Sequence, residues 1–518
     1  MKTRVLFIDD HHISVAQNMK RIMHAAEKYQ HNPVIRPDRP WEGYKVFAKN
    51  SVIFDQESKQ YRLWYNLHNS CYAVSEDGIH WEKPDLGLVD YQGSGKNNLL
   101  GKDIFQIVYG RDLQGPESAA HTYKTISWNQ ERGNYMLQST DGIIWEEGET
   151  AVIPGSGDTF ITVKSTCALT GQGSLPGFLQ SDQAYLGFVR WCCPVGRFDG
   201  SSKIKPSRRV QALVTSNDFL DWGNPVRILT PDERDDQIAH ARIEASLSDG
   251  SLSSDCYEDR RCEFYTMLAF PYEDMYVGLL LVFYASYEYN RIGLANQSGP
   301  AEIQLVASRD LIDWYRLGDR EPFIPKGKIG DFDWGMSWYC SLPIVQNDKL
   351  LFYYTGVVHN HGGEKDVQVW QDMKAKVESG ALPGLCSIGL ATLRRDGFVS
   401  LDAGDEPGTV LTKPISWPEN GVLHINADAS GGEVEVCLCQ PDGTPYEGFE
   451  HSMPITDDNT DCVVVWPQSE SRAFSEHTHG TAAEAPVARG IGNTIRPEAP
   501  VRLKIAAKNA SIFSFWIT

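Results

Sequence analysis

The sequence predicts an all-β protein, a five-bladed β-propeller followed by a C-terminal β-sandwich domain. The first observation is a seven-residue pattern, Ser-x-Asp-x-x-x-Trp, which occurs four times and once more in a reduced form that keeps only Asp-Gly. The copies occupy residues 75–81, 139–145, 216–222, 308–314 and 394–400. The second observation is an aromatic-rich run of strand character ahead of each copy. Repetition on this scale is typical of propellers.

Each repeat is consistent with one unit of four strands. The aromatic runs are YRLWYN, YKTISW, YLGFVRW, YVGLLLVFY and LLFYYTG. Val, Ile, Tyr, Trp and Phe favour a half-buried pleated surface, and Asp-Gly between two such runs favours a hairpin. The seven-residue pattern is therefore predicted to be the turn between the third and fourth strands. Its Asp would accept hydrogen bonds from turn amides and its Trp would cover the next strand, so we assign it no chemistry.

The repeat spacing predicts three parts. Residues 1–35 form an N-terminal extension packed on the propeller, with a short helix suggested by the spacing of Met19, Ile22 and Met23. Residues 36–404 form the propeller and residues 405–518 the sandwich, whose short strand-like runs are separated by turn signals. The five blades are predicted at residues 36–100, 101–152, 153–230, 231–326 and 327–404.

Composition limits the partners and the compartment. The net charge is −20, and no basic stripe stands out, which argues against nucleic acid and favours a neutral ligand over a polyanion. The 11 Cys are odd in number and follow no regular framework, as expected for free thiols in a reducing compartment. No secretory signal and no run of 18 apolar residues is present. We expect a cytoplasmic protein that takes a small saccharide, without a cofactor; the sequence does not indicate an oligomeric state.

Acidic residues at the starts of the first strands are the candidates for catalysis. The first strand of each propeller blade begins at one end of the central channel, so these positions converge. Asp112, Asp158, Glu263 and Asp333 are predicted at such positions, and Glu42 lies just ahead of the first blade's first strand. Converging carboxylates suit cleavage of a glycosidic bond, where one acid protonates the leaving oxygen and a second acts as nucleophile or activates water. The alternative for each is an ordinary loop carboxylate.

Aromatic and histidine side chains near these acids are the candidates for substrate binding. Trp41, Trp334 and Trp338 would stack on a sugar face or, alternatively, pack between blades. His359 and His361 alternate along a strand and would share one face. No Cys or carboxylate lies at ligand spacing beside them, so we predict hydrogen bonding to sugar hydroxyls, or a structural role, rather than a metal site.

These features resemble the five-bladed glycoside hydrolases of families 32 and 43. Gly110-Arg111-Asp112 resembles the Arg-Asp-Pro motif of family 32, and Cys262-Glu263 resembles its Glu-Cys motif in reversed order. The segments HNPVI, DGIHWEKPDLGLVDYQGSGKNN, FPYEDMYVGL and IGLATLRRDGFVSLDAGDEPGT resemble a bacterial group of family 32-like glycosidases over almost the whole chain. The resemblance implies a glycoside hydrolase, with Asp112 and Glu263 as the essential pair and Arg111 at the substrate. Several acids converging on a closed, aromatic-lined channel mouth would admit a chain end better than a chain middle, which favours exo action.

The sequence also departs from these families. The first unit lacks the Asp-Pro that carries their nucleophile or base, Leu113 stands where a Pro follows the Asp, and Glu263 lies in the fourth unit instead of the third. A non-catalytic saccharide-binding propeller therefore stays open beside the hydrolase. A phosphorylase is a third alternative, but phosphate needs a basic cluster, and only Arg111 and Lys49 are predicted near the site. Retention and inversion both stay open.

Overall fold

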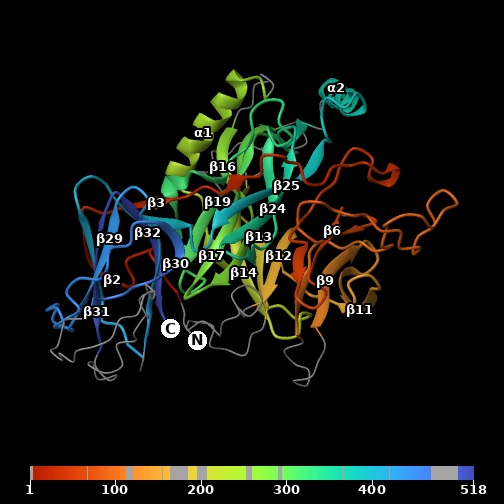
Figure 1. The fold of residues 1–518 in the computed structure, drawn as a ribbon. Helices are drawn as coiled ribbons and strands as arrows, with labels where there is room; N and C mark the ends of the chain where they lie inside the picture. The colour runs from red at the N-terminus through yellow and green to blue at the C-terminus, as the bar shows by residue number, and fades with distance from the viewer. Residues whose placement is uncertain are drawn as a thin grey trace. The chain divides into compact units, whose positions relative to one another are not determined.

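The computed structural model describes residues 4–518 except 67, 112–120, 155, 164–184, 195–206, 253–258, 290–294, 364–366, 419–420 and 468–499. The chain forms two compact units, Ala25–Leu393 and a second made of Met1–His24 with Arg394–Thr518. Both consist mainly of β-strands in several sheets, so the all-β class is confirmed (Figure 1). No helix in the described parts of the chain is long and apolar enough to cross a membrane.

The Ala25–Leu393 unit begins with three antiparallel sheets built from consecutive strands. The first contains β5 (Val52–Asp55), β6 (Gln60–Tyr65) and β7 (Cys71–Ser75). The second contains β8 (Val108–Arg111), β9 (His121–Asn129), β10 (Gly133–Ser139) and β11 (Glu146–Thr150). The third contains β12 (Ser156–Val163), β13 (Tyr185–Pro194), β14 (Ser207–Ser216) and β15 (Val226–Leu229).

The remaining strands of this unit form one sheet with the order β16-β17-β19-β22-β24-β25-β4. A single parallel pair, Ala301 with Met336, joins its two halves, each of which is an antiparallel meander. The first half contains β16 (Asp259–Tyr272), β17 (Met275–Tyr289), β18 (Ala295–Ser298), β19 (Ala301–Ser308), β20 (Trp314–Arg316) and β21 (Pro322–Ile324). The second contains β22 (Met336–Cys340), β23 (Ile344–Gln346), β24 (Lys349–Val357), β25 (Cys386–Arg394) and β4 (Glu27–Lys28).

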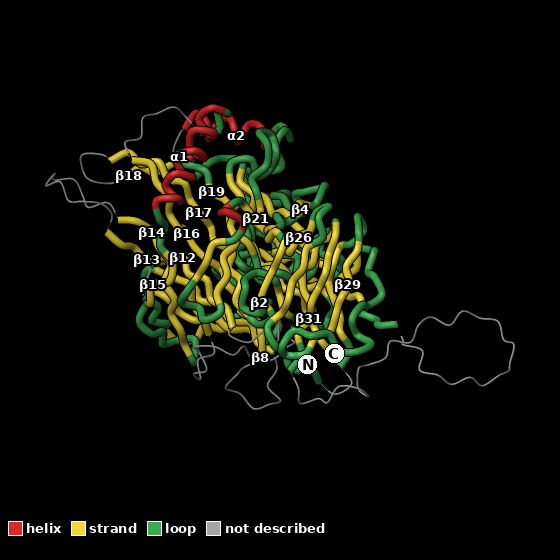
Figure 2. The backbone as a smooth tube through the Cα atoms, turned by 90° about the vertical axis from the view of Figure 1, so that its left-hand side faces the viewer, coloured by secondary structure: helices red, strands yellow, loops and turns green. Residues whose placement is uncertain are grey.

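The described residues of this unit include two α-helices, one ahead of β16 and one between β24 and β25, and the sequence analysis predicted neither. They are α1 (Glu233–Ser248) and α2 (Val367–Glu378), and Figure 2 shows both toward the same end of the unit. Helix α1 begins where Asp232 and Asp235 cap each other's backbone N–H groups, an arrangement that stabilises a helix start. Short 3-10 turns occur at η1 (Pro40–Glu42) and η3 (Gly318–Arg320).

The four complete copies of the seven-residue pattern form the same turn, as predicted. In each, the Asp carboxylate accepts two backbone N–H groups at 2.8–2.9 Å and the hydroxyl of the Ser two residues before it. The Trp indole N–H donates to the carbonyl three residues earlier. These contacts satisfy the turn's polar groups, so the pattern has a structural role.

The second unit contains two antiparallel sheets that share one hydrophobic core. The first has the order β3-β26-β32-β28-β30, with β1 on β32, and the second the order β2-β27-β31-β29. Their bounds are β1 (Val5–Leu6), β2 (Ile13–Gln17), β3 (Lys20–Met23), β26 (Val399–Ala403), β27 (Gly408–Thr412), β28 (Leu423–Asp428), β29 (Glu433–Cys439), β30 (Asp458–Val463), β31 (Arg502–Lys508) and β32 (Ala510–Ile517).

The short helix predicted from Met19, Ile22 and Met23 is wrong. Lys20–Met23 is strand β3, which pairs with β26 and places Met23 opposite Val399. A helical spacing of three apolar residues is a weak signal, and pairing with a neighbouring strand decided the conformation.

Candidate functional site

Strand β16 carries two different faces near its start. Cys262 and Phe264 are fully buried in a hydrophobic core, whereas Arg261, Glu263 and Tyr265 alternate with them and share the opposite face. Pairing with β17 skips Tyr265, since Phe264 lies opposite Val282 and Thr266 opposite Leu281. Such a β-bulge changes the direction of a side chain and is common beside active sites. The face with Glu263 is therefore separated from the core.

Glu263 is completely buried and is held by two arginines. Arg261 Nε lies 3.0 Å from Glu263 Oε1, and Arg209 from β14 forms an ion pair with Oε2. Arg209 Nη1 also donates to the hydroxyl of Tyr287 at 3.0 Å. The two guanidinium partners fix the orientation of this carboxyl group.

Two aromatic side chains from distant parts of the chain, Trp338 and His361, pack against Tyr265 beside Glu263. The ring centre of Tyr265 lies 4.8 Å from that of Trp338 and 5.6 Å from that of His361, and Trp338 stacks on His361 at 5.7 Å. The guanidinium carbon of Arg209 lies 5.1 Å from the Tyr265 ring centre. We call Arg209, Arg261, Glu263, Tyr265, Trp338 and His361 the β16 cluster.

Trp338 reaches the β16 cluster from a second irregular strand. In β22, Ser337 pairs with Gly356 and Cys340 with Tyr354, so Trp338 and Tyr339 lie together opposite one residue of β24. Tyr339 packs on Trp338 at 5.5 Å, and Lys49 Nζ lies 5.2 Å from the Tyr339 ring centre. The structure thus brings three predicted site residues, Glu263, Trp338 and His361, into one cluster.

The charges in the cluster influence one another. Burial alone would lower the pKa of Arg209, but the Glu263 carboxylate, followed by Tyr287 and Tyr265, raises it overall. Burial, and then Glu263, raises the pKa of Tyr287, so this phenol keeps its proton at neutral pH. Arg190 from β13 adds a further positive charge, with its guanidinium carbon 5.3 Å from the Tyr265 ring centre.

The backbone places Asp158 next to this region. Asp158 belongs to β12, where Ser156 pairs with Arg190 and Phe160 with Phe188, so Asp158 falls within an irregular stretch of the pairing. Asp112 lies outside the described residues. Arg111 is the last residue of β8, and its backbone pairs with that of His121 in β9. The structure places Arg111 by its backbone alone.

Glu42 and Trp41 belong to a different network. Glu42 Oε1 lies 2.7 Å from Lys83 Nζ and accepts the Tyr65 hydroxyl at 2.5 Å, while its Oε2 accepts the backbone N–H groups of Asp38 and Arg39. The indole of Trp41 donates to Asn98 at 2.8 Å. These contacts satisfy Glu42 within the protein and give it a structural environment.

Asp333 and Trp334 are also engaged away from the β16 cluster. Asp333 Oδ2 lies 2.5 Å from Lys28 Nζ and accepts the hydroxyl of Tyr354 at 2.7 Å. Trp334 packs against the apolar cluster around Val358 and Met373 on α2. The packing alternative therefore describes Trp334 in this structure.

The two histidines separate instead of sharing a site. His361 joins the β16 cluster, whereas His359 is buried, contacts the carbonyl of Asn360 through Nδ1 at 2.9 Å and lies against Trp370 of α2. Among the residues with described positions, no three His, Cys, Asp or Glu side chains converge in a way that would hold a metal ion.

Sequence reasoning missed the arginines of this site. It named only Arg111 and Lys49 as nearby cations, but Arg190, Arg209 and Arg261 surround Tyr265 and Glu263. A signal was present, because each arginine lies within or at the edge of an otherwise apolar or aromatic strand, where an arginine is costly unless it has a partner. The two-residue period of RCEFY in β16 also indicated that Arg261, Glu263 and Tyr265 share a face.

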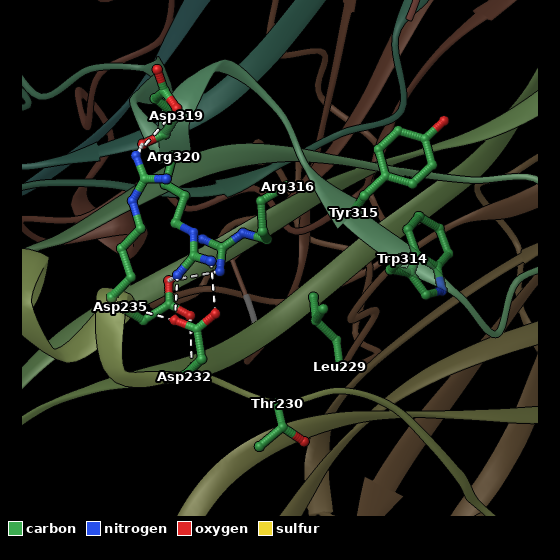
Figure 3. A pocket seen from close by; sticks show the side chains of 10 residues that line it. Leu229, Thr230, Asp232, Asp235, Trp314, Tyr315, Arg316, Asp319 and Arg320 are labelled. Carbon is green, nitrogen blue, oxygen red and sulfur yellow. Dashed lines mark hydrogen bonds and ion pairs between the residues drawn. The ribbon is translucent and has the colours of Figure 1, made fainter. Parts of the chain in front are cut away.

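A cavity of about 380 Å³ lies elsewhere in this unit, at the start of α1 (Figure 3). Arg320 forms two bonds with Asp232, and Arg316 pairs with Asp235 at 2.8 Å, so these charges neutralise one another. Trp314 donates its indole N–H to the Leu311 carbonyl as part of its turn. Self-compensated ion pairs explain this polar cavity, and we do not assign the site to it.

Comparison with known proteins finds no matching protein-family model and no matching curated protein. Solved structures do match. A glycosyl hydrolase from Bacteroides ovatus is 14% identical, with 72% of this chain and 94% of that chain covered and a TM-score of 0.39. The β-1,2-mannobiose phosphorylase from Listeria innocua, solved with β-1,2-mannobiose, is 12% identical, covers 71% and 96% and has a TM-score of 0.35.

An N-acetylgalactosamine deacetylase from F. plautii, solved with blood group B trisaccharide, is 15% identical, with 74% and 96% covered and a TM-score of 0.37. The names of these neighbours all refer to carbohydrate chemistry. Their TM-scores lie below 0.5, so they assign no activity to this chain, and its resemblance to families 32 and 43 stays a prediction.

Proposed function

We propose that this chain is a carbohydrate-active enzyme, a glycoside hydrolase that releases a terminal sugar from small oligosaccharides or glycosides. We further propose that the five meanders are blades of a β-propeller and that the two sheets of the second unit form a β-sandwich. One observation carries the functional proposal. Strands β12, β16 and β22 each depart from regular pairing near a residue chosen from the sequence: around Asp158, at Tyr265 two residues beyond Glu263, and at Trp338.

The aromatic part of the β16 cluster supports a saccharide as ligand. Tyr265 and His361 are partly exposed. Trp338 is itself buried and stacks on His361. Saccharide sites combine such apolar faces with a few well-placed polar groups. Here the polar groups are Glu263 and the arginines that hold it.

The proposed reaction uses two carboxylates. Asp158 donates a proton to the leaving oxygen as the glycosidic C–O bond breaks. Glu263 acts as base toward a water molecule or as nucleophile at the anomeric carbon, and Arg209 must first move off its Oε2, because Glu263 has no exposed surface while both arginines hold it. Water supplies the hydroxyl that ends on the sugar and the proton that restores Asp158. Asp112 is the next candidate for the acid, whereas the contacts of Glu42 and Asp333 favour structural roles.

Phosphorolysis is a second candidate, because the arginines supply the basic cluster that the sequence analysis did not find. Inorganic phosphate would then replace water as the attacking group, and the product would be a sugar 1-phosphate.

A substrate panel tests the proposal. The purified chain is incubated with aryl glycosides and with plant or algal oligosaccharides, in the presence and in the absence of phosphate. The products are identified by mass spectrometry. A free monosaccharide supports hydrolysis, and a sugar phosphate that forms only with added phosphate supports the second candidate. Binding of saccharides without any turnover would replace both with the non-catalytic binding protein.

A further inference from the structure

Two cysteines of the second unit lie side by side on strand β29. Cys437 and Cys439 are two residues apart in an extended strand, so their side chains share one face. Their sulfur atoms are 3.5 Å apart, and both are free thiols. Val434, Val436 and Leu438 alternate with them and belong to the hydrophobic core. The thiol pair therefore lies on the face of the sheet that is turned away from the core.

The neighbouring strand β31 places basic side chains beside the thiols. The register puts Lys504 opposite Cys437 and Arg502 opposite Cys439 (Figure 1). Residues directly opposite each other in an antiparallel pair share a face. Glu450 adds a negative charge near Cys437, where Lys504 opposes it. Cys437 is half-buried and Cys439 is buried, so a ligand would approach from the Cys437 side.

The spacing of the two residues disfavours a disulfide and fits a bridging ion. A strand rises about 3.3 Å per residue, so their α-carbons are separated by roughly 6.6 Å, close to the upper limit of about 6.8 Å for a disulfide. A disulfide would also need the sulfurs to approach from 3.5 Å to about 2.05 Å. Metal–sulfur bonds of about 2.3 Å span up to about 4.6 Å between two sulfurs, a separation that small side-chain rotations can reach.

The ligand set decides which class of ion fits. Burial, followed by the contact with Cys439, raises the pKa of the Cys437 thiol to about 12, so only a cation with a high affinity for sulfur displaces its proton. Structural Zn²⁺ takes four ligands, but among the described side chains no third Cys, His or carboxylate converges here. Soft thiolate ligands select Cu⁺, which two sulfurs can hold.

We propose that Cys437 and Cys439 form a binding site for a single soft cation, Cu⁺, held between two thiolates. Each thiol gives its proton to solvent as its bond to the metal forms. The oxidation state of the metal does not change, so no oxidant or reductant takes part. The inference concerns the second unit and does not depend on the proposed saccharide chemistry.

Competition for Cu⁺ tests the inference. The reduced full chain is titrated without oxygen against the coloured complex of Cu⁺ with bicinchoninate, and Zn²⁺ is titrated in parallel. The chain has 11 Cys, so variants must locate the binding. We expect the wild type to withdraw a single equivalent of Cu⁺ that the double variant Cys437→Ser with Cys439→Ser leaves with the competitor. Either single variant should bind at least roughly 100-fold more weakly, because a direct ligand costs more than an outer partner.

Cys462→Ser is the matched control, since Cys462 is another half-buried cysteine of the same unit, and it should bind Cu⁺ like the wild type. Three measurements on the wild type do not depend on how the variants fold. Cu⁺ should shield Cys437 from alkylation in peptide mass mapping and should raise the melting temperature. X-ray absorption at the copper edge should show two sulfur ligands.

Withdrawal of the same equivalent by a folded double variant, or alkylation of Cys437 that Cu⁺ does not slow, would overturn the inference. Tighter binding of Zn²⁺ than of Cu⁺ at these residues would also overturn it, because the site would then have further ligands. A disulfide between Cys437 and Cys439 that forms in air, without any Cu⁺ binding by the reduced chain, would replace the metal site with a redox pair.

Discussion

Arg209 forms an ion pair with Glu263, and the same nitrogen of Arg209 bonds to the Tyr287 hydroxyl at 3.0 Å. The side chain of Glu263 has no exposed surface, and that of Arg209 is 15% exposed. Because Arg209 also lies against the face of Tyr265, this pair links the buried carboxylate to the aromatic surface of the candidate site. Both the stability of the fold and the activity should therefore depend on the Arg209–Glu263 pair. Suitable variants can separate the two effects.

Glu263→Gln should lower the free energy of unfolding by about 3 kcal/mol, since it removes the Glu263 counter-charge from the buried Arg209 and leaves Arg261 with Asp259 alone. It should also abolish saccharide turnover. Chemical denaturation and product release measure the two effects.

The double variant Arg209→Met with Glu263→Gln is the control for this prediction. Removing both partners should recover part of the stability, because the uncompensated charge is gone, but not the activity. Activity that returns along with stability would show that Glu263 has only a structural role.

Glu42→Gln should destabilise the chain without changing turnover. Glu42 accepts bonds from Tyr65, from Lys83 and from two backbone N–H groups, so its loss costs about 1–3 kcal/mol of stability. Glu82→Gln, on an exposed neighbour, is the control and should match the wild type in both measurements. A stable Glu42→Gln that is inactive would return Glu42 to the catalytic candidates.

The repeated turns should make stability depend on acid pH. Burial raises the pKa of Asp218, but hydrogen bonds from the amides of Asp221 and Leu220 and from Ser216 outweigh it, and the pKa lies below its ordinary value. The ionised form is favoured in the folded state. Its contribution is therefore complete above the unfolded pKa of about 3.9 and is lost as the pH falls through the folded pKa.

Asp218→Asn should accordingly reduce the loss of stability below about pH 4, because the amide oxygen still accepts the turn bonds but no longer titrates. Denaturation midpoints from neutral to acid pH measure this effect. Asp221→Asn, at an exposed position in the same turn, should follow the wild-type curve. If the Asp218→Asn and wild-type curves were parallel, the carboxylate would not couple to folding.

Asp158→Asn should reduce turnover of unactivated oligosaccharides by 100-fold or more, on the order expected for a general acid. Aryl glycosides whose leaving groups need little protonation should lose less. Asp112→Asn is compared in the same assays, because it is the second candidate. Equal losses on both substrate types would argue against proton donation by Asp158.

The sequence predicted the local features of this fold better than the site. The turn at Asp77 and its three equivalents could be predicted because every contact is made within seven residues. Helix α1 was missed although Asp232 and Asp235 carry its capping signal, since the repeat pattern suggested only strands there. Short-range signals were sufficient where the interactions are short-range.

The site was predicted only in part, because its contacts join distant strands. Glu263 and Trp338 were chosen correctly as members of one cluster, whereas Arg209 could be placed beside Glu263 only by the register of β14 and β16 in three dimensions. Bulges at Tyr265 and Trp338 also have no clear sequence signal, and they determine which side chains face the cluster. In the sequence, Glu42 and Asp333 could not be distinguished from the other candidate catalytic acids. Their ion-pair partners, Lys83 and Lys28, lie far from them along the chain.

Turnover by Tyr265→Ala tests the central claim most directly, because Tyr265 contacts Trp338, His361, Arg190 and Arg209 and so lies at the centre of the aromatic surface. The wild type and the variant are assayed on the saccharide panel by mass spectrometry, with Tyr315→Ala in another part of the same unit as the control. We predict that the wild type and Tyr315→Ala release sugar, whereas folded Tyr265→Ala loses at least roughly 100-fold in kcat/KM, on the order of a lost stacking surface and misplaced substrate. Undiminished turnover by Tyr265→Ala would contradict the assignment of the active site to the β16 cluster.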